Sequence, residues 1–183
     1  LKNLTSERNM DKLHYSDEND KCYGLAGMAI TLAVCDAREL LTGMDIDAPA
    51  GESVAMAPDF YLRGNPRMPA KYVWTRTLGH FRLAVELVLG NLMCRRYVRD
   101  RKGLARETAD SLRALVRQDA AEHCALETDE ADRLFEEAYD LADRIFRHSG
   151  VHDIAHEFAE MIAGRRSLDA VEIFDFLARR GLS

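Results

Sequence analysis

The residues best suited to bind a ligand lie just before a long predicted helix. Three cations, Arg63, Arg67 and Lys71, recur every four residues as the chain enters that helix. The first N–H groups of a helix lack partners and carry partial positive charge, so this end favours anions. Arginine adds bidentate hydrogen bonds to phosphate or carboxylate. With Phe60 and Tyr61 as pocket walls and Trp74 just after the cations, the segment predicts an anion-binding site. The alternative is a solvated loop whose bases pair with the protein's own acids.

A second set of residues could bind a metal ion. His152, His156 and Glu160 are spaced by four and form one row on a predicted helix. Two histidines at i and i+4 are a sound pair of metal ligands, although the spacing differs from H-E-x-x-H. The row lies opposite the apolar stripe of its helix, so a metal there needs further ligands from another helix or another chain. The alternative interpretation is a polar row that faces solvent.

The adjacent residues His152 and Asp153 are similar to part of the H…HD…D pattern of the metal phosphohydrolases of the HD superfamily. On this resemblance, His123 supplies the first metal ligand and Asp169 or Asp175 supplies the last. The stretch before the dyad is polar where that family usually has a buried apolar run. The resemblance covers two adjacent residues, and we assign no family from it.

A run of cations stands at the end of the long predicted helix. It comprises Arg95, Arg96, Arg99, Arg101 and Lys102. Such a run can bind a nucleic-acid backbone. Cations are also favoured at a helix C-terminus by the helix dipole and the last carbonyls. Because the sequence pI is near 5.5, which argues against a general nucleic-acid binder, we interpret the run as a charged helix end.

Charge is sorted into blocks along the chain. Residues 61–102 hold ten Lys or Arg and two acids, whereas residues 119–143 hold ten acids and one base. The net charge of −6 hides both blocks. They must be neutralised against each other, a second copy or a partner. Because surface ion pairs contribute only about 0–1 kcal/mol each, complementary blocks matter more for orientation and partner choice than for stability.

Apolar periodicity predicts the elements that position these residues. Helices are expected at about 20–41, 70–102, 105–124, 128–148 and 152–163, with a last one capped by Ser167 and ended by Gly181. The fold class is therefore all-α, an irregular bundle of five or six helices. Small residues make the first helix thin, so we expect it at the centre, where neighbours can approach closely.

Two segments are expected to lie outside this bundle. Residues 44–70 contain all four prolines and predict one long loop, of a length that is often functional, with a short extended piece within 52–62. Residues 1–19 are polar and predict an N-terminal arm, followed by a single helical domain at 20–183.

Composition favours a soluble cytoplasmic protein. The four cysteines form no C-x-x-C pair and lie among apolar residues, so we expect packed, reduced thiols. The longest apolar run, 25–35, is too short to span a bilayer, and no signal-peptide pattern is visible. We predict a non-enzymatic module that binds itself or another protein, with a homodimer as one form. The alternative is an anion-binding protein or metal-dependent enzyme, and the sequence indicates no particular cofactor.

Overall fold

The structure, a computed structural model, describes residues 14–49, 51–61 and 70–182, without the side chains of Asp59, Tyr61 and residues 70–76. The helices are α2 (Glu18–Val34), α3 (Ala70–Met93), α4 (Arg106–Cys124), α5 (Thr128–Arg147), α6 (Ser149–Arg165) and α7 (Ala170–Arg179). Two 3-10 turns, η1 (Arg38–Leu40) and η2 (Pro58–Tyr61), a π-helix, η3 (Cys94–Arg99), and three strands, β1 (Leu41–Asp45), β2 (Val54–Met56) and β3 (Ser167–Asp169), complete the chain. The predicted helical class is confirmed, with a small sheet added.

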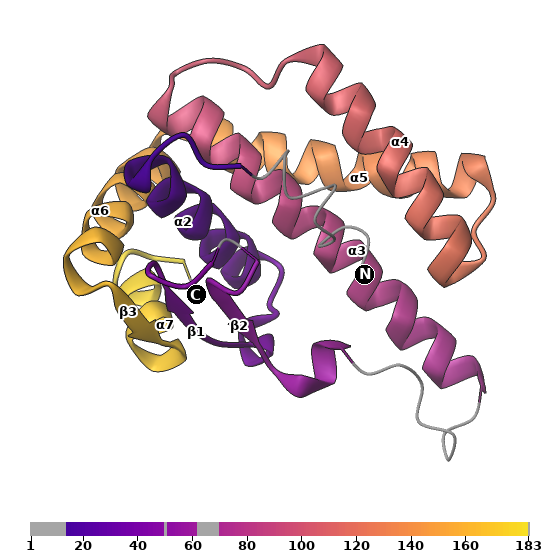
Figure 1. The fold of residues 1–183 in the computed structure, drawn as a ribbon, viewed down its shortest axis with the longest axis horizontal. Helices are drawn as coiled ribbons and strands as arrows, with labels where there is room; N and C mark the ends of the chain where they lie inside the picture. The colour runs from indigo at the N-terminus through magenta and orange to yellow at the C-terminus, as the bar shows by residue number, and fades with distance from the viewer. Residues whose placement is uncertain (1–13, 50, 62–69, 183) are drawn as a thin grey trace.

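Helix α2 lies at the centre, between α3 and α6 (Figure 1). Its small residues allow this position. A Cβ atom built on Gly27 would lie 2.3 Å from the carbonyl oxygen of Gly90 on α3, so only glycine permits this crossing. The larger side chains of α2, such as Leu25 and Ile30, are completely buried. The prediction of a thin central helix is confirmed.

The predicted extent of this first helix was wrong at its C-terminal end. We expected it to reach residue 41, but α2 ends at Val34. Asp36 takes a left-handed conformation, φ 52°, and the Ala37 N–H returns to the Leu32 carbonyl at 2.9 Å. This is the geometry in which helices commonly stop, usually at glycine. The chain then turns through η1 into β1.

A three-stranded antiparallel sheet packs beside α2, with the strand order β2-β1-β3. Strand β2 falls inside the segment where a short extended piece was predicted. Strand β3 was not predicted, and Ser167, the expected cap of the last helix, lies in it. The cap of α7 is Asp169, whose side chain accepts a hydrogen bond from the Glu172 N–H at 2.8 Å. The first strand thereby pairs with a strand near the C-terminal end of the described chain.

Helices α4, α5 and α6 follow the predicted order, with α5 packed against α3 and α4 along one side of the molecule (Figure 1). Helix α5 begins at Thr128, but its cap is Glu127, which forms a reciprocal capping box with Glu130. Helix α6 begins at Ser149, three residues before the predicted start. Aromatic side chains from α3, α5 and α6 fill the core, namely Phe81, Phe135, Phe146 and Phe158.

Candidate functional site

Most of the predicted anion site lies outside the described residues. Arg63 and Arg67 are not described, and the same holds for the side chains of Tyr61, Lys71 and Trp74. The backbone bears out one part of the argument, because α3 begins at Ala70, where the helix was expected to start. The anion site stays a prediction.

The histidine row is half-buried instead of facing solvent. The His152 ring places Nε2 2.6 Å from the Phe146 carbonyl oxygen, and the His156 ring places Nδ1 2.5 Å from the Tyr23 hydroxyl. The second contact arises because α6 packs on α2. Glu160 is exposed. Each histidine therefore uses one ring nitrogen to join neighbouring elements, and metal binding by the row stays a prediction.

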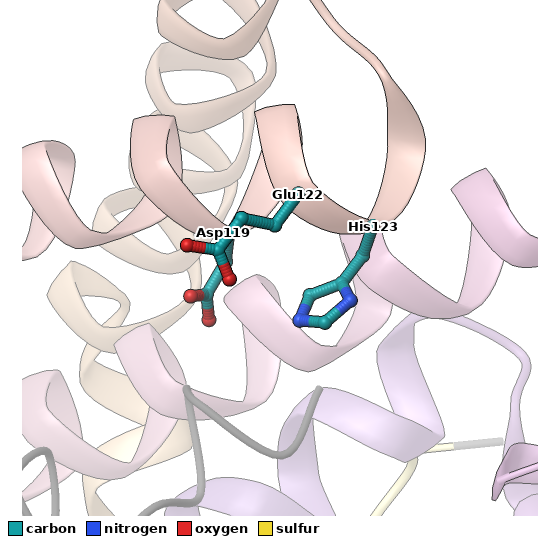
Figure 2. Close-up of side chains that lie close together, drawn as sticks. All are labelled: Asp119, Glu122 and His123. Atoms are coloured by element: carbon teal, nitrogen blue, oxygen red, sulfur yellow. The ribbon is translucent and has the colours of Figure 1, made fainter.

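Among the described residues, one group of three side chains lies close enough to hold a metal ion together. Asp119, Glu122 and His123 each offer a ligand atom, and these atoms lie within 4.8 Å of one another. Figure 2 shows the three side chains leaving neighbouring turns of α4 on the same side. Asp119 is buried, whereas Glu122 and His123 are exposed. The spacing of three and four residues was visible in the sequence, but only His123 had been considered as a ligand.

The group also bears on the resemblance to the HD superfamily. Neither His152 nor Asp153 belongs to any such group within the described ranges, so His123 stands apart from the dyad it was expected to join. Asp169, a candidate last ligand, caps α7. The other candidate, Asp175, lies in a groove between α6 and α7.

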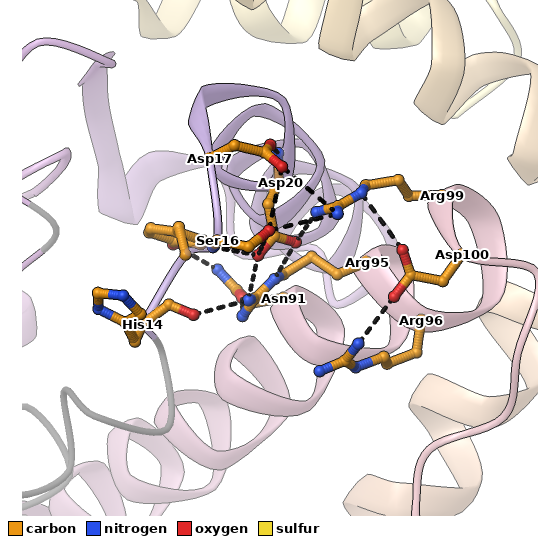
Figure 3. A network of polar contacts seen from close by, with 10 residues as sticks. His14, Ser16, Asp17, Asp20, Asn91, Arg95, Arg96, Arg99 and Asp100 are labelled. Atoms are coloured by element: carbon orange, nitrogen blue, oxygen red, sulfur yellow. Dashed lines mark hydrogen bonds and ion pairs between the residues drawn. The ribbon is translucent and has the colours of Figure 1, made fainter.

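The cationic run at 95–102 differs in part from the predicted charged helix end. Arg95 is 3% exposed and points inward, where its Nε donates to an Asp20 carboxylate oxygen at 2.6 Å. Arg99, four residues later on η3, forms an ion pair with the same carboxylate. Figure 3 shows both guanidinium groups directed at Asp20, while Arg96 pairs with Asp100 at 2.8 Å. Arg95 and Arg99 therefore belong to an internal ion-pair network around Asp20, which the sequence did not predict. Arg96, Arg101 and Lys102 are exposed, and Arg96 lies in the last turn of η3, as expected of a charged helix end.

This network also holds the chain ahead of α2. Arg95 donates to the His14 carbonyl at 2.9 Å, and its guanidinium carbon lies 4.8 Å from the centre of the Tyr15 ring. The Tyr15 hydroxyl accepts a hydrogen bond from Asn91 at 2.8 Å. Burial by itself raises the pKa of Asp20, but hydrogen bonds from Arg95 and the Ser16 N–H, with the two arginine charges, lower it to about 2. Asp20 is thus a buried anion stabilised by two cations.

Ion pairs within the chain neutralise much of the acidic block. Arg82 on α3 joins the two blocks, because its Nη1 lies 3.0 Å from Glu137 on α5. On α4, Arg117 pairs with Asp132 at 2.6 Å, and Arg113 pairs with Glu136. The remaining acids include those that cap α5. Of the alternatives for neutralising the two blocks, contact with each other is observed at the Arg82–Glu137 bridge.

The thiols are packed and weakly acidic. All four cysteines are free, and three of them are buried. Burial raises the pKa of Cys22 to about 11. Burial, together with the neighbouring Glu86 carboxylate, raises the pKa of Cys35 to about 12. Because the thiolate is the reactive form, neither residue is suited to nucleophilic catalysis.

A shallow groove of about 360 Å³ lies between α6 and α7. Its apolar part is formed by Met161, Val171 and Phe176, and Val171 is 68% exposed. The remaining lining residues are charged, namely Arg165, Glu172, Asp175, Arg179 and Arg180. An apolar stripe at residues 171, 174 and 177 of α7 would by itself place Val171 in the core, but the structure exposes it. The groove was therefore not foreseen.

Comparison with known proteins identifies no relative. No family model matches the chain, and neither a curated protein nor a solved structure is significantly similar to it. No helix within the described ranges is long and apolar enough to cross a membrane. The function must therefore be argued from the geometry alone.

Proposed function

We propose that the protein is a non-enzymatic interaction module that holds an acidic amphipathic helix of a partner protein in the groove between α6 and α7. The observation that carries the proposal is the position of Val171. Exposed at 68%, it is the most exposed large apolar side chain in the described ranges, and it lies beside Met161 and Phe176 in the groove. Exposed apolar surface with a polar rim is typical of protein-binding sites.

The charge of the rim indicates the chemistry of the partner. Three arginines and two carboxylates line the groove, and one carboxylate, Glu172, already pairs with Arg165. Arg179 has no acidic partner among the described residues, and its Nε donates to a carbonyl of its own helix at 3.2 Å. Arg180 pairs with Glu157 and lies over the Phe176 ring, 5.4 Å from its centre. A carboxylate on the partner would complement Arg179.

The groove also suits a helical segment. It is lined by residues of two helices, α6 and α7, and an amphipathic helix binds a groove between helices through apolar residues at i, i+3, i+4 and i+7. Acidic flanks on that helix would then meet the arginine rim. Such charge contacts mainly fix the orientation of the partner helix and raise its association rate, and they add less to its affinity.

Charges of the two blocks already pair within one chain. The groove is therefore a better candidate for a protein-binding site than a dimer interface formed by those blocks. The bridges of Arg82, Arg113 and Arg117 to α5 use charges that a dimer would otherwise need. The anion site at residues 60–74 and the histidine row are alternative proposals for ligand binding or metal-dependent catalysis. Most of the first lies outside the described residues, and each histidine of the second contacts a neighbouring element through one ring nitrogen.

The test uses two synthetic amphipathic helical peptides that share one leucine face and carry either glutamate or lysine on the flanks. Binding is followed by fluorescence anisotropy at low and high salt. We expect the glutamate peptide to bind more tightly, with an affinity that falls as salt rises. Val171→Glu should abolish binding and Arg179→Ala should weaken it. Val34→Glu is the matched control, because Val34 is the other exposed large apolar residue in the described ranges, at 41%.

Two results would overturn the proposal. One is equal binding of both peptides, or binding of neither. The other is equal loss of binding in the Val34→Glu and Val171→Glu variants. Circular dichroism of each variant separates lost binding from lost folding.

A further inference from the structure

We propose that α4 carries a binding site for a divalent transition-metal ion, formed by Asp119, Glu122 and His123. The site is independent of the groove, which lies between α6 and α7. Three potential ligand atoms, two carboxylate oxygens and one imidazole nitrogen, lie within 4.8 Å of one another. Side chains at i, i+3 and i+4 share one helix face, which brings the three groups together without help from a distant element.

The spacing of the ligand atoms is close to what a metal needs. Bonds of about 2.0–2.2 Å from zinc to nitrogen and oxygen place neighbouring ligands roughly 3–4 Å apart. Glu122 and His123 are exposed, so small rotations of their side chains can close the remaining gap. Buried Asp119 supplies the fixed ligand. Figure 2 shows the His123 ring and the two carboxylates on the same side of the helix.

The electrostatic surroundings also favour a cation. Helix α4 ends at Cys124, so all three residues lie in its last turns, where the helix dipole is negative. Gln118 donates a hydrogen bond from Nε2 to Glu122 at 3.1 Å, a contact that can orient this carboxylate from outside the ligand set. His123 is exposed, and no hydrogen bond or ion pair of its ring is found within the described ranges.

The donor set indicates the class of metal. An imidazole nitrogen suits Zn²⁺, Co²⁺ or Ni²⁺, whereas Mg²⁺ and Ca²⁺ prefer oxygen ligands alone. Three protein ligands leave at least one position for water, and the exposure of Glu122 and His123 gives solvent access to it. The site therefore fits a zinc-type ion with an open coordination position.

The experiment is calorimetric titration of the full chain, made without a histidine tag, with Zn²⁺ and with Mg²⁺. We expect one Zn²⁺ per chain and no competition from Mg²⁺. His123→Ala and Glu122→Gln should each weaken Zn²⁺ binding by roughly tenfold or more, the scale of losses known for residues around metal sites. Both residues are exposed, so the variants should fold, which circular dichroism checks. Titration with Co²⁺ should show visible absorption bands that His123→Ala removes.

Two control variants make the test specific. Glu107→Gln changes another exposed acid of the same helix, near its other end, and should bind Zn²⁺ as the wild type does. His156→Ala removes a ligand of the alternative histidine row and should also leave binding unchanged. Absence of Zn²⁺ binding, unchanged affinity in both His123→Ala and Glu122→Gln, or loss of binding in His156→Ala with retention in His123→Ala would each overturn the proposal.

Discussion

Arg95 and Asp20 form a buried ion pair that joins η3 to the start of α2 across 75 residues of sequence. Both residues are under 5% exposed. A buried charge is costly unless it is paired, so removal of one partner leaves the other without compensation. The pair therefore fixes how these two elements meet.

Asp20→Asn should destabilise the protein by about 3–5 kcal/mol, because it leaves the buried Arg95 charge without its anion. Urea unfolding followed by circular dichroism measures the loss. Asp100→Asn is the comparison variant, since its ion pairs with Arg96 and Arg99 are both partly exposed, and it should cost about 1 kcal/mol or less. Equal losses in the two variants would contradict a special role for the buried pair.

The lowered pKa of the Asp20 carboxyl group predicts that the protein loses stability in acid. This pKa is about 2 in the folded protein against 3.8 for the unperturbed group. A depressed pKa contributes stability that is complete above the unfolded value and is lost as pH falls through the folded value. The contribution of Asp20 should therefore disappear between about pH 4 and pH 2. Unfolding free energies measured over this range should fall more steeply for wild type than for Asp20→Asn, and parallel curves would refute the assignment.

Helix periodicity predicted most of the fold because local contacts determine it. Helix α5, with its two adjacent apolar stripes, was predicted to within one residue at each end. The sheet could not be predicted because strands of three to five residues are too short to show a clear alternation of apolar and polar residues. In addition, β1 pairs with residues far away in sequence. The end of α2 could not be predicted because Asp36 takes a left-handed conformation, which glycine usually adopts at helix ends.

In the candidate sites too, features set by local geometry could be predicted from sequence, whereas features set by distant contacts could not. The spacing of Asp119 and His123 on one helix is readable from sequence, since it depends on local geometry. By contrast, the inward orientation of Arg95 depends on a partner 75 residues earlier, which a charge count cannot supply. The exposure of Val171 likewise follows from how α7 packs against β1 and α2, not from its own pattern.

Gly27→Ala should destabilise the crossing of α2 and α3. The added methyl group would meet the Gly90 carbonyl oxygen at 2.3 Å, so the backbones must separate, at a cost of about 1–3 kcal/mol. Gly79→Ala on α3 is the matched control, because no atom of the described residues lies within 4 Å of its Cβ position. It should stabilise the helix by up to about 1 kcal/mol. Thermal unfolding of both variants measures these effects. A Gly27→Ala variant more stable than the wild type would disprove the close crossing of α2 and α3.

The Arg82–Glu137 bridge should contribute little to stability. Its side chains are 45% and 50% exposed, so a double-mutant cycle with alanine should give a coupling energy of about 0.2–1 kcal/mol that falls as salt increases. Size-exclusion chromatography of Arg82→Ala should show an unchanged association state. A shift in that state would instead assign this bridge a role between copies of the chain.

Strand β1 has a consequence for the order of folding. One of its edges pairs with β2, which follows soon after, and the other pairs with β3, so that Gly43 lies opposite Asp169. Pairing β1 with β3 closes a loop of more than a hundred residues. Closing it costs chain entropy before any hydrogen bond between the two strands is gained. Helices formed by local contacts should therefore assemble first, and β3 should join last. During synthesis on the ribosome, one edge of β1 must wait unpaired until residues 167–169 emerge.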